Sequence, residues 1–556
     1  MKRTISFTSM GMALGSFPSE AQVPDATINT ACYFHKNQNK KNHNNDHKQE
    51  KDESKQDNDN DGEGAPPTIA ELVTHVVEPL LRTYPRLSQI MNIETHKLEA
   101  TPRPYAARDL IRTFYITGPE SLTHQTIVEH LQDDLKIKRK KQTATNQNKD
   151  VDDGGNENTG DSNDDDDELL LPWWELLRIE NTGSGPSAVV LRVHHALADG
   201  LSLVHAFSNI LTHPQTGKPI GQGRGEREGG EGKTSTTFHP SIPNKPTSSS
   251  RPNILAQFWS LLQSVTYVLT LGISRFDDET AFSKTTPSPS PSSHRNRVHS
   301  GRRTFVLFPV IPLAFIKELK DKAACSVNDI LMTAISQAIH DYCVDQKDPM
   351  FVSGGESIDE RVLTKRSQLQ CRALLPVAFP SKADELANPE TALRNKWCLI
   401  SSDIGVGWTD ILDRLRHIHS RTKVFKETVP PRAAVQLAIQ NEVVPRLLPH
   451  AVARQAVWDI FSRHSLVLTN VPGPQHPCCL ATRPVKDVQL FFNNLLPQVD
   501  FITYDGRVYG NMLFDDQSLP GLKDCFAKYY GRSLVSLAHR LDVSIPNALQ
   551  DYISES

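Results

Sequence analysis

The chain has 556 residues, more than one hydrophobic core usually organises, so two or more domains are expected. Its 61 basic and 65 acidic residues leave a net charge of -4, which excludes binding to nucleic acid or to an acidic surface through the overall field of the molecule. The eight cysteines include no CxxC pair, and we expect them to be reduced thiols facing the cytosol.

Composition also separates several stretches from the rest of the chain. Residues 1–19 lack acidic side chains and their apolar run is too broken for a secretory signal, so we expect no cleaved leader, with a transit peptide as the alternative. Residues 35–64 contain no aliphatic or aromatic side chain and residues 139–168 are similar, so both should be disordered insertions. Residues 214–252 and 285–300 are rich in Ser and Pro and are interpreted as flexible connectors.

The first half of the chain alternates predicted strands and helices. Apolar periodicity predicts strands at 28–34, 110–116, 172–181 and 187–193, and helices at 67–82 and 200–211. The last two strands are separated by the turn sequence TGSGP, which predicts a hairpin.

The second half continues this mixture. A helix is predicted at 326–343, and strands at 303–310, 371–379, 396–404, 464–474, 488–494 and 500–514. No internal repeat is present. We therefore predict an α/β or α+β protein of two halves, residues 1–213 and 302–556, joined by a crossover linker at 214–301.

An apolar run leads directly into the sequence HHALADG at 194–200. Because successive side chains of a strand point to opposite faces, His194 and His195 are badly placed to bind one metal ion, and one ring should face a cavity. Asp199 is suited to capping the next helix and to pairing with an arginine, and Gly200 permits a tight turn. A histidine at such a bend suits a general base, and the alternative is a core histidine beside an ordinary helix cap.

The absence of other motifs narrows the chemistry. No GxSxG elbow, no P-loop and no persuasive GxGxxG is present, so serine hydrolysis and nucleotide chemistry lack support. Cys478 or Cys479 could act as a nucleophile, but neither has an activating context. Acyl transfer from a thioester needs only a base for the acceptor hydroxyl and a donor that stabilises the oxyanion.

The stretch HHALADG matches the HHxxxDG signature of the coenzyme A-dependent acyltransferase superfamily, and other blocks resemble the wax ester synthase/diacylglycerol acyltransferase family. PWWELLRIE resembles its PLW block with Trp173 in place of leucine, SVNDILMTAI its Asn-Asp block, and LTNVPGP its SNVPGP block with Thr469 in place of serine. ITYDGRVYGNMLFDD resembles its closing strand pair, and the blocks occur in family order. The plant-type acyltransferases fit less well, because their DFGWG motif is absent.

The resemblance implies two chloramphenicol-acetyltransferase-like halves with a tunnel at their interface. It implies that His195 is the catalytic base and that His194 and Asp199 orient its loop. Substrate-binding or site-lining roles are implied for Pro172, Trp174, Asn328, Asp329, Asn470, Pro472, Gly473 and Pro474. Each also has a structural interpretation as a strand start, core residue, helix start or turn, and Asn470 is a candidate for the oxyanion donor.

The same resemblance implies transfer of a fatty acyl group from acyl-CoA to a long-chain alcohol, giving a wax ester, or to diacylglycerol, giving triacylglycerol. Acyl-CoA is then a substrate, and no metal or bound organic cofactor is implied. The alternatives are a non-catalytic lipid- or acyl-CoA-binding protein of the same fold, and an acyltransferase for another acceptor.

Both lipid acceptors partition into membranes, so we expect the protein to meet a membrane or lipid-droplet surface. The expected location is the cytosolic face of the endoplasmic reticulum or a lipid droplet, with the plasma membrane as an alternative. Residues 253–274 are uncharged over about the length that a bilayer needs but are interrupted by Gln, Ser and Thr. An interfacial helix, a helix packed on the protein and a membrane span all stay open for this segment.

Overall fold

The computed structural model describes most of the chain outside the polar stretches. The described ranges are 26–35, 64–92, 97–131, 168–221, 274–283, 300–351, 366–379, 383–438 and 450–553, with a few single positions between them. Except at their ends, the expected insertions at 35–64 and 139–168 and the flexible connectors at 214–252 and 285–300 lie outside these residues, as does most of segment 253–274. Those predictions are therefore not tested. The boundaries 1–213, 214–301 and 302–556 also stay a prediction.

The first sheet has five strands in the order β17-β1-β8-β7-β4. Its members are β1 (Thr27–Phe34), β4 (Ile111–Ile116), β7 (Trp174–Asn181), β8 (Ser187–His194) and β17 (Asp487–Phe492). The predicted hairpin is confirmed, because β7 and β8 pair antiparallel from Trp174↔Val193 to Ile179↔Ala188. All residues of β8 are buried, as expected for a central strand that is covered on both faces.

The first half of the chain also contains helical segments. They are α2 (Ile69–Leu72), a π turn (Val73–Val77), α3 (Glu78–Thr83), α4 (Glu120–His130) and α5 (Gly200–Ser208). The helix predicted at 67–82 is confirmed as one helical stretch that contains the π turn and begins at a capping box of Thr68 and Glu71. The predicted end of the second helix at 211 is wrong, because α5 ends at Ser208 and β9 (Leu211–Thr212) pairs with β15 (Cys479–Leu480).

The second sheet has seven strands and is built from the second half of the chain. Its members are β10 (Arg303–Leu307), β11 (Ile311–Pro312), β12 (Arg372–Ala378), β13 (Trp397–Asp403), β14 (Leu466–Val471), β18 (Gln498–Tyr504) and β19 (Arg507–Asp515). The order is β10-β19-β18-β14-β12-β13, with β11 also on β19. All the strands predicted for this half are present, most of them shorter than predicted, and the stretch 500–514 forms two antiparallel strands, β18 and β19.

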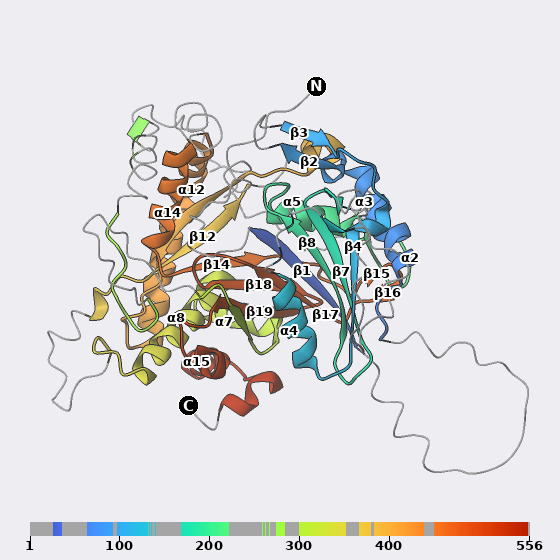
Figure 1. The fold of residues 1–556 in the computed structure, drawn as a ribbon. Coiled ribbons are helices and arrows are strands. Elements are labelled where there is room, and N and C mark those ends of the chain that lie inside the picture. Colours follow the sequence, from blue (N-terminus) through green and yellow to red (C-terminus); the bar gives the residue numbers. More distant parts are fainter. Residues whose placement is uncertain are drawn as a thin grey trace, which may run out of the picture.

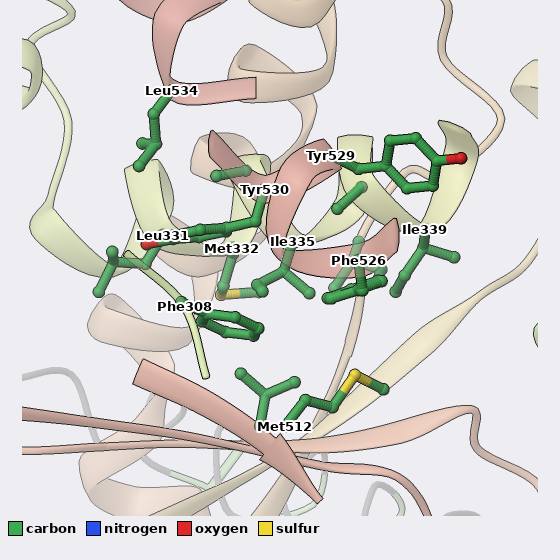
Figure 2. Close-up of a cluster of buried hydrophobic side chains, with 14 of the residues drawn as sticks. Phe308, Leu331, Met332, Ile335, Ile339, Met512, Phe526, Tyr529, Tyr530 and Leu534 are labelled. Carbon is green, nitrogen blue, oxygen red and sulfur yellow. The ribbon is translucent and has the colours of Figure 1, made fainter. Parts of the chain in front are cut away.

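The second half also contains helices, several of which pack against the second sheet. They are α7 (Leu313–Lys322), α8 (Val327–Asp345), α10 (Ala383–Ala387), α11 (Pro389–Ala392), α12 (Ile411–Ala438), α14 (His450–Ser462) and α15 (Leu522–Leu541). Figure 2 shows the buried contact of α8 and α15 with the sheet, where Phe308 and Met512 lie beneath Met332, Ile335, Phe526 and Tyr530. In the parts of the chain that the structure describes, no helix is both long and apolar enough to cross a membrane.

Short elements complete the fold. They are the 3-10 turns Pro85–Ser88, Ala107–Leu110 and Asn547–Tyr552, and the strands β2 (Gln89–Asn92), β3 (Lys97–Ala100), β5 (Arg139–Lys140), β6 (Glu168–Leu169) and β16 (Arg483–Pro484). Among the described residues, β2 pairs with β3, β5 pairs with β6, and β16 pairs with β15, so these strands do not extend either of the two larger sheets.

Strand β17 joins the two halves. It comes from the second half of the chain but pairs antiparallel with β1 in the first sheet, from Ile28↔Phe492 to Tyr33↔Asp487 (Figure 1). Strand β1 pairs on its other side with β8, where Thr27 lies opposite His194. The end of β17 is therefore held one strand away from the His-His sequence, although about 300 residues of chain separate them.

Candidate active site

The two adjacent histidines lie where β8 ends and the chain turns towards α5. His194 is the last residue of β8, is fully buried and packs edge-on against the Trp173 ring, with ring centroids 5.0 Å apart. Its Nδ1 accepts a hydrogen bond from the backbone N–H of Ala196 at 3.1 Å. His194 therefore fixes the turn from the core side, as expected for the histidine that does not face a cavity.

His195 lies between side chains from the second half of the chain. Its ring centroid is 5.2 Å from that of Trp397 and 5.6 Å from that of Phe492, the latter in an edge-to-face contact at 85°. Its backbone N–H donates to the carbonyl of Ala26 at 2.8 Å. The residue as a whole keeps 9% of its surface exposed.

The protonation of His195 follows from this enclosure. Burial lowers the pKa of His195, and a contact with its own carbonyl, the charge of Asp199 and the side chain of Asn395 oppose that shift only in part. Within the described residues, the buried Nδ1 atom of the ring has no hydrogen-bond partner. The imidazole is therefore neutral near pH 7, which is the state that a general base requires.

Asp199 connects the turn to the second half of the chain. Its carboxylate accepts the N–H of Ser202 at 2.9 Å, which makes it the N-cap of α5, and accepts the N–H of Lys396 at 2.9 Å. Its own N–H donates to the carbonyl of Arg394 at 2.7 Å. The helix cap predicted from sequence is present, but in the described residues the contact with arginine is to its backbone rather than to its guanidinium.

Residues 394–396 hold the turn from the opposite side. The Asn395 side chain donates to the carbonyl of His195 at 2.7 Å, and the Ser202 hydroxyl donates to the carbonyl of Arg394 at 3.0 Å. From the N-terminal side, the Arg86 guanidinium donates to the carbonyl of Ala196 at 2.9 Å. Sequence reasoning missed Arg86, Asn395, Trp397 and Phe492, because no spacing pattern relates them to HHALADG.

Gly200 begins α5 without an unusual backbone conformation. Its φ is not positive, and a Cβ atom added there would meet nothing within 4 Å. The turn does not require glycine for its backbone, contrary to the role expected from sequence. The glycine instead leaves open space next to the capped end of α5.

Trp174 and Pro172 lie in the core beside β8. Trp174 is fully buried, and its indole N–H donates to the carbonyl of Leu87 at 2.8 Å. Pro172 is also buried, and its carbonyl accepts the N–H of Trp174 at 2.7 Å. Both residues therefore support the strand that leads to the histidines.

Asn328 and Asn470 are brought together. The Asn470 amide donates to the Asn328 oxygen at 2.6 Å, which ties the end of β14 to the first turn of α8. Asp329 is fully buried and accepts hydrogen bonds from His419 at 2.9 Å and from Thr422 at 2.7 Å. Burial alone would raise the pKa of Asp329, but these hydrogen bonds lower it overall.

The turn that follows β14 is built on a required glycine. A Cβ atom on Gly473 would lie 2.2 Å from the carbonyl oxygen of Thr503 on β18. The carbonyl of Pro474 accepts the N–H of Asp505 at 3.0 Å, so the Pro472–Gly473–Pro474 turn lies against the end of that strand. None of the contacts that His195 makes in the described part of the chain involves this turn, Asn328 or Asp329.

The alternative chemistries find little support in the geometry. Burial raises the pKa of Cys478 to about 12 and also raises that of Cys479, so neither thiol is ionised near neutral pH. All eight cysteines are free thiols, as expected. Among the described residues, no group of three or more His, Cys, Asp or Glu side chains is arranged to hold a metal ion.

Sequence models of one family match both halves of this site. The wax ester synthase/diacylglycerol acyltransferase catalytic domain matches residues 169–331, which include the His-His sequence, and the WS/DGAT C-terminal domain matches residues 394–537. Together they span more than half of the chain. The chain belongs to the wax ester synthase/diacylglycerol acyltransferase family. It is accordingly an O-acyltransferase, and the second match begins at Arg394, in the segment that holds the turn.

Individual relatives are distant in sequence. A probable diacylglycerol O-acyltransferase of Mycobacterium tuberculosis is 22% identical over 390 residues, which cover 67% of this chain and 73% of that protein. Wax ester synthase/diacylglycerol acyltransferase 6 of Arabidopsis thaliana is 21% identical over 325 residues, covering 54% of this chain and 58% of that protein.

Solved structures agree on the fold. A wax ester synthase/diacylglycerol acyltransferase from Marinobacter aquaeolei VT8 superposes with a TM-score of 0.51 at 14% identity, covering 97% of this chain and 100% of that one. A trichothecene 15-O-acetyltransferase from Fusarium sporotrichioides gives a TM-score of 0.51 at 10% identity, covering 97% and 95%. At this identity the likeness concerns the fold alone, and it confirms the predicted α/β architecture of two chloramphenicol-acetyltransferase-like halves.

Proposed function

We propose that this protein transfers a fatty acyl group from acyl-CoA to the hydroxyl of a long-chain alcohol or of diacylglycerol, with His195 as the general base. The observation that carries the proposal is the position of the His195 ring, between Trp397 and Phe492, where the His-His turn meets the second half of the chain. Family membership supports acyl transfer to a lipid acceptor, and the sequence relatives bear the names of enzymes that act on diacylglycerol or form wax esters.

The proposed reaction has two steps. The neutral His195 imidazole accepts the proton of the acceptor hydroxyl while its oxygen forms a bond to the thioester carbonyl carbon, and the carbonyl electron pair moves onto oxygen. The tetrahedral intermediate then reforms the carbonyl and breaks the carbon–sulfur bond. The CoA thiolate takes the proton back from the imidazolium, so the base is regenerated and no other reactant is consumed.

The environment of His195 suits both states of the ring. Burial lowers its pKa and keeps the resting imidazole neutral, while the carboxylate charge of Asp199 favours the imidazolium that forms during the reaction. The aromatic walls, Trp397 and Phe492, are apolar and limit the access of water, which would otherwise compete as an acceptor. We propose that a tunnel between the two halves brings the two substrates to this ring.

The lipid acceptor requires contact with a lipid surface. Phe258, Trp259 and Leu262 expose 62%, 60% and 45% of their surface, and all three belong to the uncharged segment 253–274. Large exposed apolar side chains close together in sequence are typical of a helix that lies in a membrane interface. We propose that this segment contacts the cytosolic face of the endoplasmic reticulum or a lipid droplet, with the plasma membrane as an alternative.

An acceptor panel tests the function. The purified full-length protein is incubated with radiolabelled palmitoyl-CoA and, separately, with hexadecanol, dioleoylglycerol, hexadecylamine or no acceptor, and the lipids are separated by thin-layer chromatography. We expect labelled wax ester or triacylglycerol, no amide, and little free acid, and we expect EDTA to leave the rate unchanged because no step uses a metal. Binding of palmitoyl-CoA without any ester product would contradict the proposal and favour a carrier protein.

A further inference from the structure

The side chain of Asn395 is bonded directly to the residue that carries the proposed base. Its amide N–H donates a hydrogen bond to the carbonyl of His195 at 2.7 Å, and Asn395 as a whole is only 4% exposed. A short hydrogen bond in a buried place restricts the movement of both groups that it joins. Asn395 therefore fixes the backbone from which the imidazole projects.

The segment around this asparagine is itself held in place. Residues 392–393 are buried in the same core cluster as residues 196–197, although they come from the second half of the chain. The Asp199 carboxylate accepts the N–H of Lys396 at 2.9 Å, and the carbonyl of Arg394 accepts the N–H of Asp199 at 2.7 Å. The amide is thus presented to the His-His turn by backbone that packs into the first half.

The two ring nitrogens of His195 are not equivalent. The Nδ1 atom is closed to solvent, so an acceptor hydroxyl cannot reach it without displacing the groups packed around it. Proton transfer from the hydroxyl must therefore use Nε2. Because a neutral imidazole has one N–H and one acceptor nitrogen, Nε2 can accept a proton only when the resting proton is on Nδ1.

The polar groups beside the ring favour this tautomer. Burial lowers the pKa of His195, and its own carbonyl, the charge of Asp199 and the Asn395 side chain each raise it. Among the described residues, Nδ1 makes no hydrogen bond of good geometry. The interaction of the ring with the carbonyl therefore depends on where that carbonyl is held, and Asn395 is the side chain that holds it.

We propose that Asn395 is a positioning residue, which keeps the proton of the resting His195 imidazole on Nδ1 and Nε2 directed towards the acceptor hydroxyl. The inference rests on the proposed function and extends it to the orientation of the base. The hydroxyl proton passes to Nε2 as the oxygen attacks the thioester carbon, and the same proton leaves Nε2 for the CoA thiolate. The proton on Nδ1 stays in place throughout.

Asn395→Leu is the first test, because leucine has nearly the shape of asparagine and cannot donate to the His195 carbonyl. A misplaced catalytic group can cost about 100-fold in rate, so we expect kcat for ester formation to fall by about 10- to 100-fold. The KM for palmitoyl-CoA should change less than about threefold, because Asn395 acts through the base.

The pH profile separates positioning from stability. Asn395 is one of the groups that raise the pKa of His195, so the acidic limb of kcat/KM should move to lower pH in Asn395→Leu. Asp199 is retained in this variant and its charge continues to act on the ring. The position of the limb does not depend on how much of the protein is folded, so a loss of stability alone would not move it.

Asn511→Leu is the matched control. Asn511 is fully buried, and its amide donates to the carbonyl of Leu490 on β17, also at 2.7 Å. This variant removes a hydrogen bond of the same type and length from a carbonyl that does not belong to His195. It should keep kcat within about twofold of the unmodified protein and leave the acidic limb in place.

Asn395→Ala is measured in the same way in case leucine does not fit. It removes the same donor by shortening the side chain, and it should lower kcat and move the acidic limb in the same direction. An unmoved limb in the position-395 variants, or an equal change in Asn511→Leu, would overturn the inference while the proposed function stands. No ester formation by the unmodified protein would instead remove the proposed function itself.

Discussion

Replacing Asp199 by asparagine should loosen the connection between the His-His turn and the second half of the chain. The carboxylate is 1% exposed and receives two backbone N–H donors, from Ser202 and from Lys396, each at 2.9 Å. One donor belongs to α5 and the other to the segment that precedes β13. Asparagine has the same size but only one oxygen, so its amide nitrogen must face one of the two N–H groups.

The magnitude follows from those two contacts. A hydrogen bond to a buried charged group contributes about 1.5–3 kcal/mol, and a buried donor left without a partner costs about 1–3 kcal/mol. Since one contact survives in Asp199→Asn, we expect the free energy of unfolding to fall by about 2–4 kcal/mol. The loss of the negative charge should also lower the pKa of His195 further, because Asp199 is one of the groups that raise it.

Urea unfolding followed by circular dichroism measures the first effect. Thr68→Ala is the control, since Thr68 caps α2 through a hydrogen bond from Glu71 that stays within the first half of the chain, and it should cost about 1 kcal/mol. The pH dependence of kcat/KM measures the second effect, and its acidic limb should move to lower pH. If the free energy of unfolding of Asp199→Asn stays within about 0.5 kcal/mol of that of the unmodified protein, and the acidic limb of its pH profile does not move, Asp199 does not join the His-His turn to the second half of the chain.

Two further predictions concern stability. Burial raises the pKa of Asp500 to about 8, above its value in the unfolded chain. The contribution of this carboxyl group to the free energy of unfolding is therefore fully present below about pH 4. It is lost as the pH rises to 8, by up to about 1.4 kcal/mol per pH unit. Asp500→Asn should remove that slope between pH 5 and pH 8 in urea unfolding, and an identical slope would contradict the assignment. Gly473→Ala should lower the free energy of unfolding by about 1–3 kcal/mol, because the added Cβ meets the Thr503 carbonyl. Gly200→Ala, whose Cβ meets nothing, should leave the melting temperature unchanged. Equal melting temperatures of the two variants would contradict this prediction.

The local features of the site could be predicted from sequence. The apolar run of β8 and the TGSGP turn define the hairpin, and Asp199 followed by an apolar helix defines the N-cap. The seven residues of HHALADG and the NVPG turn carry much of the family resemblance. Gly473 is needed for a steric reason that a Pro-Gly turn already suggests.

The long-range features could not be predicted. Phe492 reaches His195 only because β17 leaves the second half of the chain and pairs with β1, and strand pairing at such a distance has no signature in a single sequence. Asn395 and Trp397 lie 200 or more positions from His195 and act through one backbone carbonyl and one ring contact. The shortened end of α5 likewise depends on the pairing of β9 with β15.

The central claim is that the imidazole of His195 removes the proton of the acceptor. The most direct measurement is the rate of ester formation from palmitoyl-CoA and hexadecanol or dioleoylglycerol by His195→Ala, compared with His124→Ala, which removes a buried histidine that lies against Tyr33 and Phe305. The account predicts a fall of about 100- to 10000-fold for His195→Ala at an unchanged melting temperature, and near-normal turnover for His124→Ala. Turnover by folded His195→Ala within about threefold of the unmodified protein would contradict it.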